Sequence, residues 1–255
     1  MKKIVKYVIL DILRSRSVIG YAVLLMILSF TLFSLDTDPA RGMLSLLNII
    51  LILVPLVSIV FSSIYVYNAS EFIELLVSQP IRRRQLWISL FSGLSVSLCI
   101  AVIAGIGIPL LINAPDARGW TLLASALLVT IIFVALALLA SVWTRDKARG
   151  IGLAVMAWLF FTLLFDGIVL FFLFQFMDYP LDNAMIAFSV LNPVDLARVM
   201  VLLQIDISVL MGATSAVFHN VFGNSAGMLV AFSVMTLWAF VPLWASLRRF
   251  VRKDL

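Results

Sequence analysis

Few side chains in this sequence could carry out chemistry, and their spacing does not favour catalysis. The chain has 255 residues with one histidine, His219, and one cysteine, Cys99. Residues 223–227 match the G-x-S-x-G pattern of serine nucleophiles around Ser225. That pattern acts on a turn between a strand and a helix, and no strand is predicted in this chain. We therefore interpret the match as small residues that open a helix, and we predict no catalytic residue.

The sequence predicts no metal site and no nucleotide site of its own. A structural zinc site needs about four cysteine or histidine ligands, and the methionines that could bind copper are irregularly spaced. No glycine is followed by lysine, so the phosphate-binding loop G-x-x-x-x-G-K-[ST] is absent. If the protein uses ATP, another subunit must bind it. We expect no cofactor in this chain.

The composition predicts an all-α integral membrane protein with a single transmembrane domain, 1–255. Hydrophobic residues make up 64% of the chain and charged residues 12%, with a mean hydropathy of +1.16. Soluble domains carry about 25% charged residues, so a soluble domain, a disordered chain and a disulfide scaffold are excluded. Helices of sufficient length to cross about 30 Å of hydrocarbon are expected at six runs: 18–35, 44–67, 86–113, 120–143, 150–177 and 225–247.

The distribution of basic residues predicts that both termini are cytoplasmic. Fifteen of the 18 lie in the two tails and in the loops after the second and fourth runs. Arg41, Arg118 and Arg198 lie on the other side. By the positive-inside rule the larger group is cytoplasmic. The net charge of +5 therefore reports topology and attraction to anionic lipid, and we predict no nucleic-acid partner.

Residues 1–17 are expected to form a helix in the cytoplasmic interface, before the first span. Apolar residues recur at helical spacing from Ile4 to Leu13, with lysines among them. The alternative is a positively charged flank that only fixes the orientation of the first span.

The loop 70–84, after the second span, predicts a short amphipathic helix suited to a cytoplasmic partner. Ser70 could cap this helix, and Pro80 would end it because the residue before a proline avoids helical angles. The alternative is a solvated loop whose arginines only set the topology. The candidate residues are Glu71, Phe72, Glu74, Leu75, Leu76, Pro80, Arg82 and Arg83.

The segment 178–224 is predicted to be external and to hold a helix that begins at Asn192. Asparagine is a favoured N-cap and proline a favoured first helical residue. We expect the helix to run to about Met211, either in the outer interface or as a re-entrant helix, with 213–224 as a return limb. The candidate residues for an external partner are Asn192, Pro193, Asp195, Arg198 and Asp206.

Asp166 is the only formal charge within the six predicted spans. An acid at the centre of a membrane helix costs about 2.5–3.5 kcal/mol on insertion scales. Asp166 must therefore face protein or water, or be protonated. It could serve as a gate, a relay or a subunit contact. Alternatively, it could be a neutral acid hydrogen-bonded to a serine or threonine of a neighbouring helix.

Together these features resemble a type-2 ABC exporter permease. Residues 74–83, E-L-L-V-S-Q-P-I-R-R, are similar to the coupling-helix signature of that family, roughly E-x-L-L-x-x-P-[IVL]-x-R. Residues 13–16, L-R-S-R, resemble its L-R-x-R motif before the first span. Asn68 and Ala69 depart from the acidic residues and Gly-Thr pair usual there. The resemblance implies a non-catalytic membrane subunit whose coupling helix docks on a separate ATPase chain that binds ATP and magnesium.

A narrower resemblance is to the NosY permeases of nitrous oxide reductase maturation transporters. It is carried by Gly152-Leu-Ala, Phe165-Asp166 and Leu191-Asn192-Pro193-x-Asp195. It implies a homodimer with two cytoplasmic ABC ATPase subunits and a periplasmic β-helical protein. The complex would lie in a bacterial inner membrane and serve assembly of the copper–sulfide centre. The alternative is a generic exporter of a lipid, drug or small metabolite.

Overall fold

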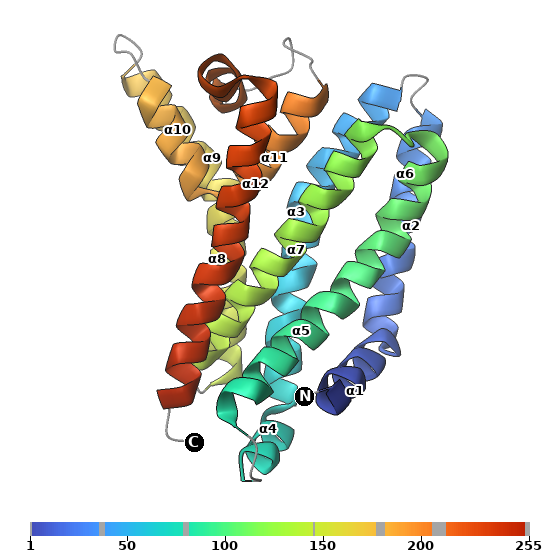
Figure 1. Ribbon diagram of the computed structural model, residues 1–255, viewed down its shortest axis with the longest axis vertical. Coiled ribbons are helices and arrows are strands. Elements are labelled where there is room, and N and C mark those ends of the chain that lie inside the picture. Colours follow the sequence, from blue (N-terminus) through green and yellow to red (C-terminus); the bar gives the residue numbers. More distant parts are fainter. Residues whose placement is uncertain are drawn as a thin grey trace.

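The computed structural model describes residues 2–35, 39–78, 82–144, 146–176, 182–205 and 213–252. Within these ranges the chain is helical and contains no strand (Figure 1). The elements in chain order are α1 (Lys2–Leu13), α2 (Arg16–Leu35), α3 (Pro39–Asn68), α4 (Ser70–Val77), α5 (Arg83–Val102), the π-helical turn η1 (Ile103–Gly107), α6 (Ile108–Asn113), α7 (Ala117–Trp143), α8 (Lys147–Leu159), the π-helical turn η2 (Phe160–Leu164), α9 (Phe165–Gln175), α10 (Asp182–Leu191), α11 (Pro193–Ile205) and α12 (Ala213–Arg252).

The prediction of six spans is confirmed. The helical segments long and apolar enough to cross a membrane are Arg16–Leu35, Ala40–Asn68, Arg83–Asn113, Ala117–Trp143, Lys147–Gln175 and Ala226–Arg252. Several extend beyond the predicted limits to basic residues, because the backbone ladder continues past the apolar run and long basic side chains can extend to the interface. The protein is therefore a multi-pass α-helical membrane protein.

α7 forms the centre of the bundle. It packs against α3, α5, α11 and α12 (Figure 1). Apolar side chains along its whole length are buried, from Leu122 through Phe133 to Leu138. A span that is apolar on every face is expected in such a central position. The remaining spans are arranged around α7, and their outward faces are left for lipid or for partner chains.

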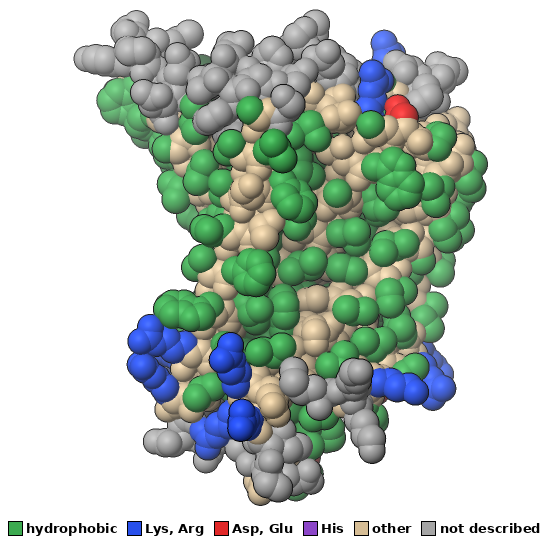
Figure 2. Space-filling model, viewed as in Figure 1, with side chains coloured by type: hydrophobic (Ala, Val, Ile, Leu, Met, Phe, Trp, Pro, Cys, Tyr) green, Lys and Arg blue, Asp and Glu red, His purple; other side chains and the backbone are tan. Residues whose placement is uncertain are grey.

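α1 is a separate helix at the end of the bundle that also holds α4 and the last turns of α12 (Figure 1). Its apolar face packs against α5, with Val8 and Ile12 buried. The two helices are so close at Gly93 that a Cβ there would lie 2.5 Å from Cγ1 of Val8. Basic side chains gather on both sides of this end of the molecule (Figure 2).

α10 and α11 form a bent pair, with an angle of 111° between Ala184–Leu191 and Pro193–Gln204. Most side chains of α11 are buried, and the helix packs against α7 and α12. This burial places α11 within the bundle and not on its surface. Residues 213–224 do not form a separate return limb, because they are the first part of the continuous helix α12. Asp206 and Met211 lie outside the described residues.

Candidate functional site

The predicted cytoplasmic helix is present as α4, but the prediction that Ser70 caps it is wrong. Ser70 is its first helical residue, and Ala69 occupies the cap position with φ −87° and ψ 8°. The Ala69 N–H donates to the carbonyl of Tyr65 at 2.9 Å, and the Ile73 N–H donates to the carbonyl of Ala69 at 2.8 Å. Backbone hydrogen bonds therefore continue from α3 into α4, and a single non-helical residue separates the two helices.

The predicted apolar face of α4 is divided between the bundle and the surface. Ile73 is buried and Leu76 packs partly buried against the core, so these two residues anchor the helix. Leu75 is 66% exposed, and the ring of Phe72 is partly exposed with its centroid 5.6 Å from that of Tyr7 on α1. The exposed Glu71 and Glu74 complete the outward surface.

The remaining candidates of the 70–84 loop are only partly described. Arg82 is exposed and has an extended backbone with φ −66° and ψ 123°, immediately before α5. Arg83 is half-buried in the first turn of α5. Pro80 lies outside the described residues.

The loop between α7 and α8 contacts the end of α3 beside α4, which sequence reasoning missed. Lys147 Nζ donates to Oδ1 of Asn68 at 2.7 Å. The hydroxyls of Tyr67 and Thr144 are hydrogen-bonded at 2.5 Å. Gly150 makes this contact possible, because a Cβ there would overlap the Tyr67 hydroxyl. In the sequence analysis Lys147 counted only as one of the basic residues that set the membrane topology. Nothing in the sequence indicates its contact with Asn68, which lies 79 positions away.

Asp166 forms an ion pair with Arg198 of α11. Both terminal nitrogens of Arg198 donate to Oδ2 of Asp166 at 3.2 Å. Nη1 of Arg198 also lies 3.7 Å from Oδ1 of Asp195, one helical turn earlier. The side chains of Asp166 and Arg198 are 38% and 31% exposed, and that of Asp195 is 7% exposed. The partner of Asp166 is therefore a cation on the bent pair, not a serine or threonine.

Asn192 lies at the vertex of the bent pair, the bend between α10 and α11. Its side chain makes two hydrogen bonds, one within the pair and one to the fifth span. Its Oδ1 accepts the Val194 N–H at 3.0 Å, which confirms the predicted N-cap with Pro193 as the first helical residue. Its Nδ2 donates to the carbonyl of Phe161 at 2.9 Å. Phe161 belongs to η2, near the middle of the fifth span. The vertex therefore lies at mid-span depth, beside a π-helical turn of the kind often found at functional positions.

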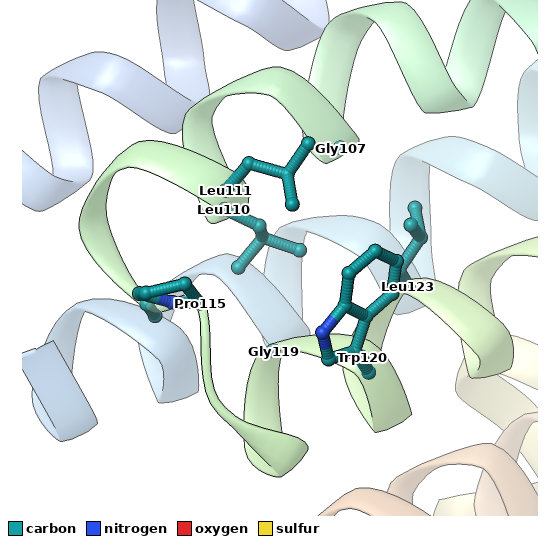
Figure 3. Close-up of a pocket in the computed structure, with 8 residues that line it drawn as sticks. Gly107, Leu110, Leu111, Pro115, Gly119, Trp120 and Leu123 are labelled. Carbon is teal, nitrogen blue, oxygen red and sulfur yellow. The ribbon is translucent and has the colours of Figure 1, made fainter.

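Two cavities at the end of the bundle opposite α4 are apolar. Figure 3 shows one of about 10 Å³, bordered by Leu110, Pro115, Trp120 and Leu123, which has room for about one water molecule. The other is an open apolar groove of about 310 Å³ between α7, α11 and α12, bordered by the exposed Trp120, Leu229 and Phe232. Neither cavity is a hydrophilic pathway.

Residues 35–255 match the family described as ABC-2 family transporter protein. The match includes α4, the bent pair and five of the six spans. The chain belongs to the ABC-2 transporter family. It is also 28% identical over 213 residues to the probable ABC transporter permease protein NosY of Pseudomonas aeruginosa, covering 79% of this chain and 74% of that protein. The protein is thus the membrane permease subunit of an ABC transporter.

The permease brings the predicted site residues together in two groups, one at an end of the membrane-spanning bundle and one near mid-span depth. One group is the exposed surface of α4, beside α1 and the start of α8. The other is the charge cluster of Asp166, Arg198 and Asp195, next to the capped vertex at Asn192. Sequence reasoning placed Arg198 and Asp166 in separate groups, whereas the structure pairs them.

Proposed function

We propose that the permease binds a cytoplasmic ABC ATPase through the outward surface of α4 and couples ATP hydrolysis to movement of its spans. The observation that carries this proposal is the combination of exposed Glu71, Phe72, Glu74 and Leu75 on a helix anchored by Ile73. Exposed apolar side chains beside charged ones are typical of a protein-binding surface. The ATPase would bind ATP and magnesium, so this chain needs neither.

Contacts around α4 give a physical route for the movement. α4 follows α3 after one residue, touches α1 through Phe72 and Tyr7, and lies beside the Lys147–Asn68 hydrogen bond to α8. A displacement of α4 would therefore act on several spans together. Packed helices move as nearly rigid bodies in such transitions, so we expect rocking of spans.

We propose that the transporter contains two copies of the permease and two ATPases in a bacterial inner membrane. The end with α1, α4 and the last turns of α12 would be cytoplasmic, in accord with the basic side chains there. The opposite end, with the outer parts of α10 and α11, would contact a periplasmic β-helical protein.

Similarity to a probable NosY permease supports a role in maturation of the copper–sulfide centre of nitrous oxide reductase. The alternative is export of a lipid, drug or small metabolite, and the open apolar groove between α7, α11 and α12 is compatible with an apolar cargo. Deleting the gene distinguishes the two proposed functions. If the permease serves maturation, the reductase accumulates in the deletion strain without its copper–sulfide centre. A fully loaded reductase in the deletion strain would exclude that role.

Coupling through α4 is tested by ATPase assays of the purified complex in nanodiscs. Glu74→Arg is expected to lower coupled ATPase activity at least tenfold without lowering membrane insertion. The matched control is Arg118→Glu, which reverses an exposed charge at the opposite end of the bundle. Wild-type activity of Glu74→Arg would contradict docking through this surface.

A further inference from the structure

We propose that the ends of α7 and α12 form a binding site for an anionic phospholipid. The site consists of Trp143, the last residue of α7, and of Trp244, Arg248 and Arg249 on α12. It lies at the end of the bundle that we propose is cytoplasmic, so its lipid would belong to the inner leaflet. The proposed coupling through α4 does not use these four residues.

The two arginines are held over two indole rings. Cζ of Arg248 lies 5.2 Å from the centroid of the Trp244 ring, one turn earlier on the same helix. Cζ of Arg249 lies 5.1 Å from that of Trp143, across the contact between α12 and α7. A cation over an aromatic face at this distance is attracted by the ring. The rings therefore fix the positions of two neighbouring positive charges.

The arginines keep hydrogen-bond donors for a ligand. Each guanidinium has five N–H donors, and its contact with a ring face is not a hydrogen bond. Among the described residues, neither Arg248 nor Arg249 forms an ion pair. Asp146, in the loop after α7, accepts the Arg149 N–H as the N-cap of α8. Two such arginines side by side are suited to a phosphate group, which arginine binds with paired hydrogen bonds.

The site lies at the level of the membrane interface. Trp143 ends the span Ala117–Trp143, and Trp244 lies about two turns before the end of Ala226–Arg252. The two residues are 61% and 60% exposed. α4 lies farther along the long axis, beyond the end of α12 (Figure 1), and Figure 2 shows basic side chains directly against an apolar surface where α12 ends. Tryptophan and basic residues at this level meet lipid headgroups.

An apolar stripe leads from this site toward the middle of the membrane. Leu237 and Val241 are exposed and lie on the same side of α12 as Trp244 and Arg248. Their spacing of four, three and four residues is that of one face of a helix. An acyl chain would lie along this stripe while its phosphate contacts the two arginines. The surface thus matches both parts of a phospholipid.

A phospholipid fits this surface better than a protein partner does. In a two-fold dimer through this face, Arg248 would lie near its own copy, and like charges across an interface repel. An acidic segment of a soluble protein would reach the arginines but not the apolar stripe, which lies within the span. The positive-inside rule requires basic residues at this end, but not their placement over exposed rings. The occupant is therefore an anionic phospholipid.

Equilibrium binding of acyl-labelled phosphatidylglycerol to the purified, delipidated complex tests the site. Arg248→Gln combined with Arg249→Gln is expected to weaken binding at least tenfold, because charged hydrogen bonds are lost. The matched control is Arg41→Gln combined with Arg118→Gln, which removes two exposed arginines at the opposite end and should bind as the wild type does. Wild-type affinity in the first variant, or equal affinity for phosphatidylcholine and phosphatidylglycerol, would overturn the proposal.

A second variant distinguishes a defined site from general attraction between lipid and basic residues. Trp143→Leu combined with Trp244→Leu keeps every charge but removes both rings, and should weaken phosphatidylglycerol binding at least threefold. Trp120→Leu is the control, since it removes an exposed ring at the opposite end. Unchanged binding in the double variant would mean that only bulk charge attracts the lipid, and would overturn the site.

The ATPase content of the same samples separates this proposal from docking through α4. Loss of the ATPase from the Arg248–Arg249 variant, with lipid binding unchanged, would assign the two arginines to the ATPase and overturn the lipid site. Lipid binding is read on the permease whether or not an ATPase co-purifies. Failure of the docking proposal would therefore leave the result on lipid standing.

Discussion

At the scale of single residues, the contact between Arg198 and Asp166 links two elements that the sequence keeps apart. The two residues are 32 positions apart, and both guanidinium donors end on one carboxylate oxygen. Arg198 also lies near Asp195, so one cation serves two acids. The cluster therefore ties the fifth span to the bent pair, at the level where a movement of the span would be passed to α11.

Substitutions at Asp166 should follow its role as acceptor for Arg198. Asp166→Asn keeps an acceptor oxygen, whereas Asp166→Leu leaves the guanidinium without this partner. We expect Asp166→Leu to cost roughly 1–3 kcal/mol in the free energy of unfolding and Asp166→Asn clearly less. Unfolding by detergent titration measures both. Equal losses would show that the charge, and not the hydrogen bond, is what stabilises the fold.

The ion pair itself is measured by a double-mutant cycle. Asp166→Leu and Arg198→Met should be less than additive, with a coupling of about 0.5–3 kcal/mol. A matched cycle between Asp166→Leu and Thr121→Val should give additive effects, since the hydroxyl of Thr121 donates to Ala117 within its own helix. Additivity in the first cycle would mean that the pair contributes no net stability.

At the scale of elements, the spans and α11 could be predicted, but their contacts could not. The apolar runs predicted the number of spans, and Asn192-Pro193 predicted the start of α11. The burial of α11 could not be predicted, since the segment expected to form this helix, 192–211, holds two acids and an arginine and such a helix is expected near water. The structure places one of those acids and the arginine in a cluster with Asp166.

The vertex of the bent pair depends on the two hydrogen bonds of Asn192. Asn192→Ala should destabilise the permease by roughly 1–3 kcal/mol, through loss of the cap and of the hydrogen bond to the Phe161 carbonyl. The control is Asn113→Ala, whose side chain donates only to Pro109 at the end of its own helix. The midpoint of thermal unfolding in detergent is the readout. Indistinguishable midpoints would show that the vertex is held by apolar packing alone.

The packing of α1 on α5 depends on Gly93. Gly93→Leu should displace α1, because even a Cβ there overlaps Val8. In a Cys99→Ala background, the buried Ile12→Cys should then react with a thiol reagent at least tenfold faster. Gly20→Leu is the control, since its surroundings are open. An unchanged reaction rate of Ile12→Cys would contradict the prediction that close packing at Gly93 holds α1 against α5.

At the scale of the whole molecule, one bundle joins the surface that we propose binds the ATPase to a charge cluster far from it. α4 lies at one end, with α1 and the last turns of α12 (Figure 1). The bent pair enters from the other end and meets the fifth span near its middle. The basic residues predicted that both termini and the 70–84 loop lie on one side of the membrane, but the sequence could not show that α4 lies beside contacts with α1 and α8. Those contacts join residues far apart in the chain.

The central claim is that α4 holds the ATPase subunit, and a pull-down of the tagged chain from native membranes in mild detergent tests it most directly. All co-purifying chains would be identified by mass spectrometry. We predict that an ABC ATPase is recovered with the wild type and with Leu35→Glu, whose exposed leucine is the last residue of α2, the helix that begins beside α1 and crosses to the other end of the bundle. Leu75→Glu should lose the ATPase. Intact permease recovered without any ATPase, or with as much ATPase in Leu75→Glu as in the wild type, would contradict the account.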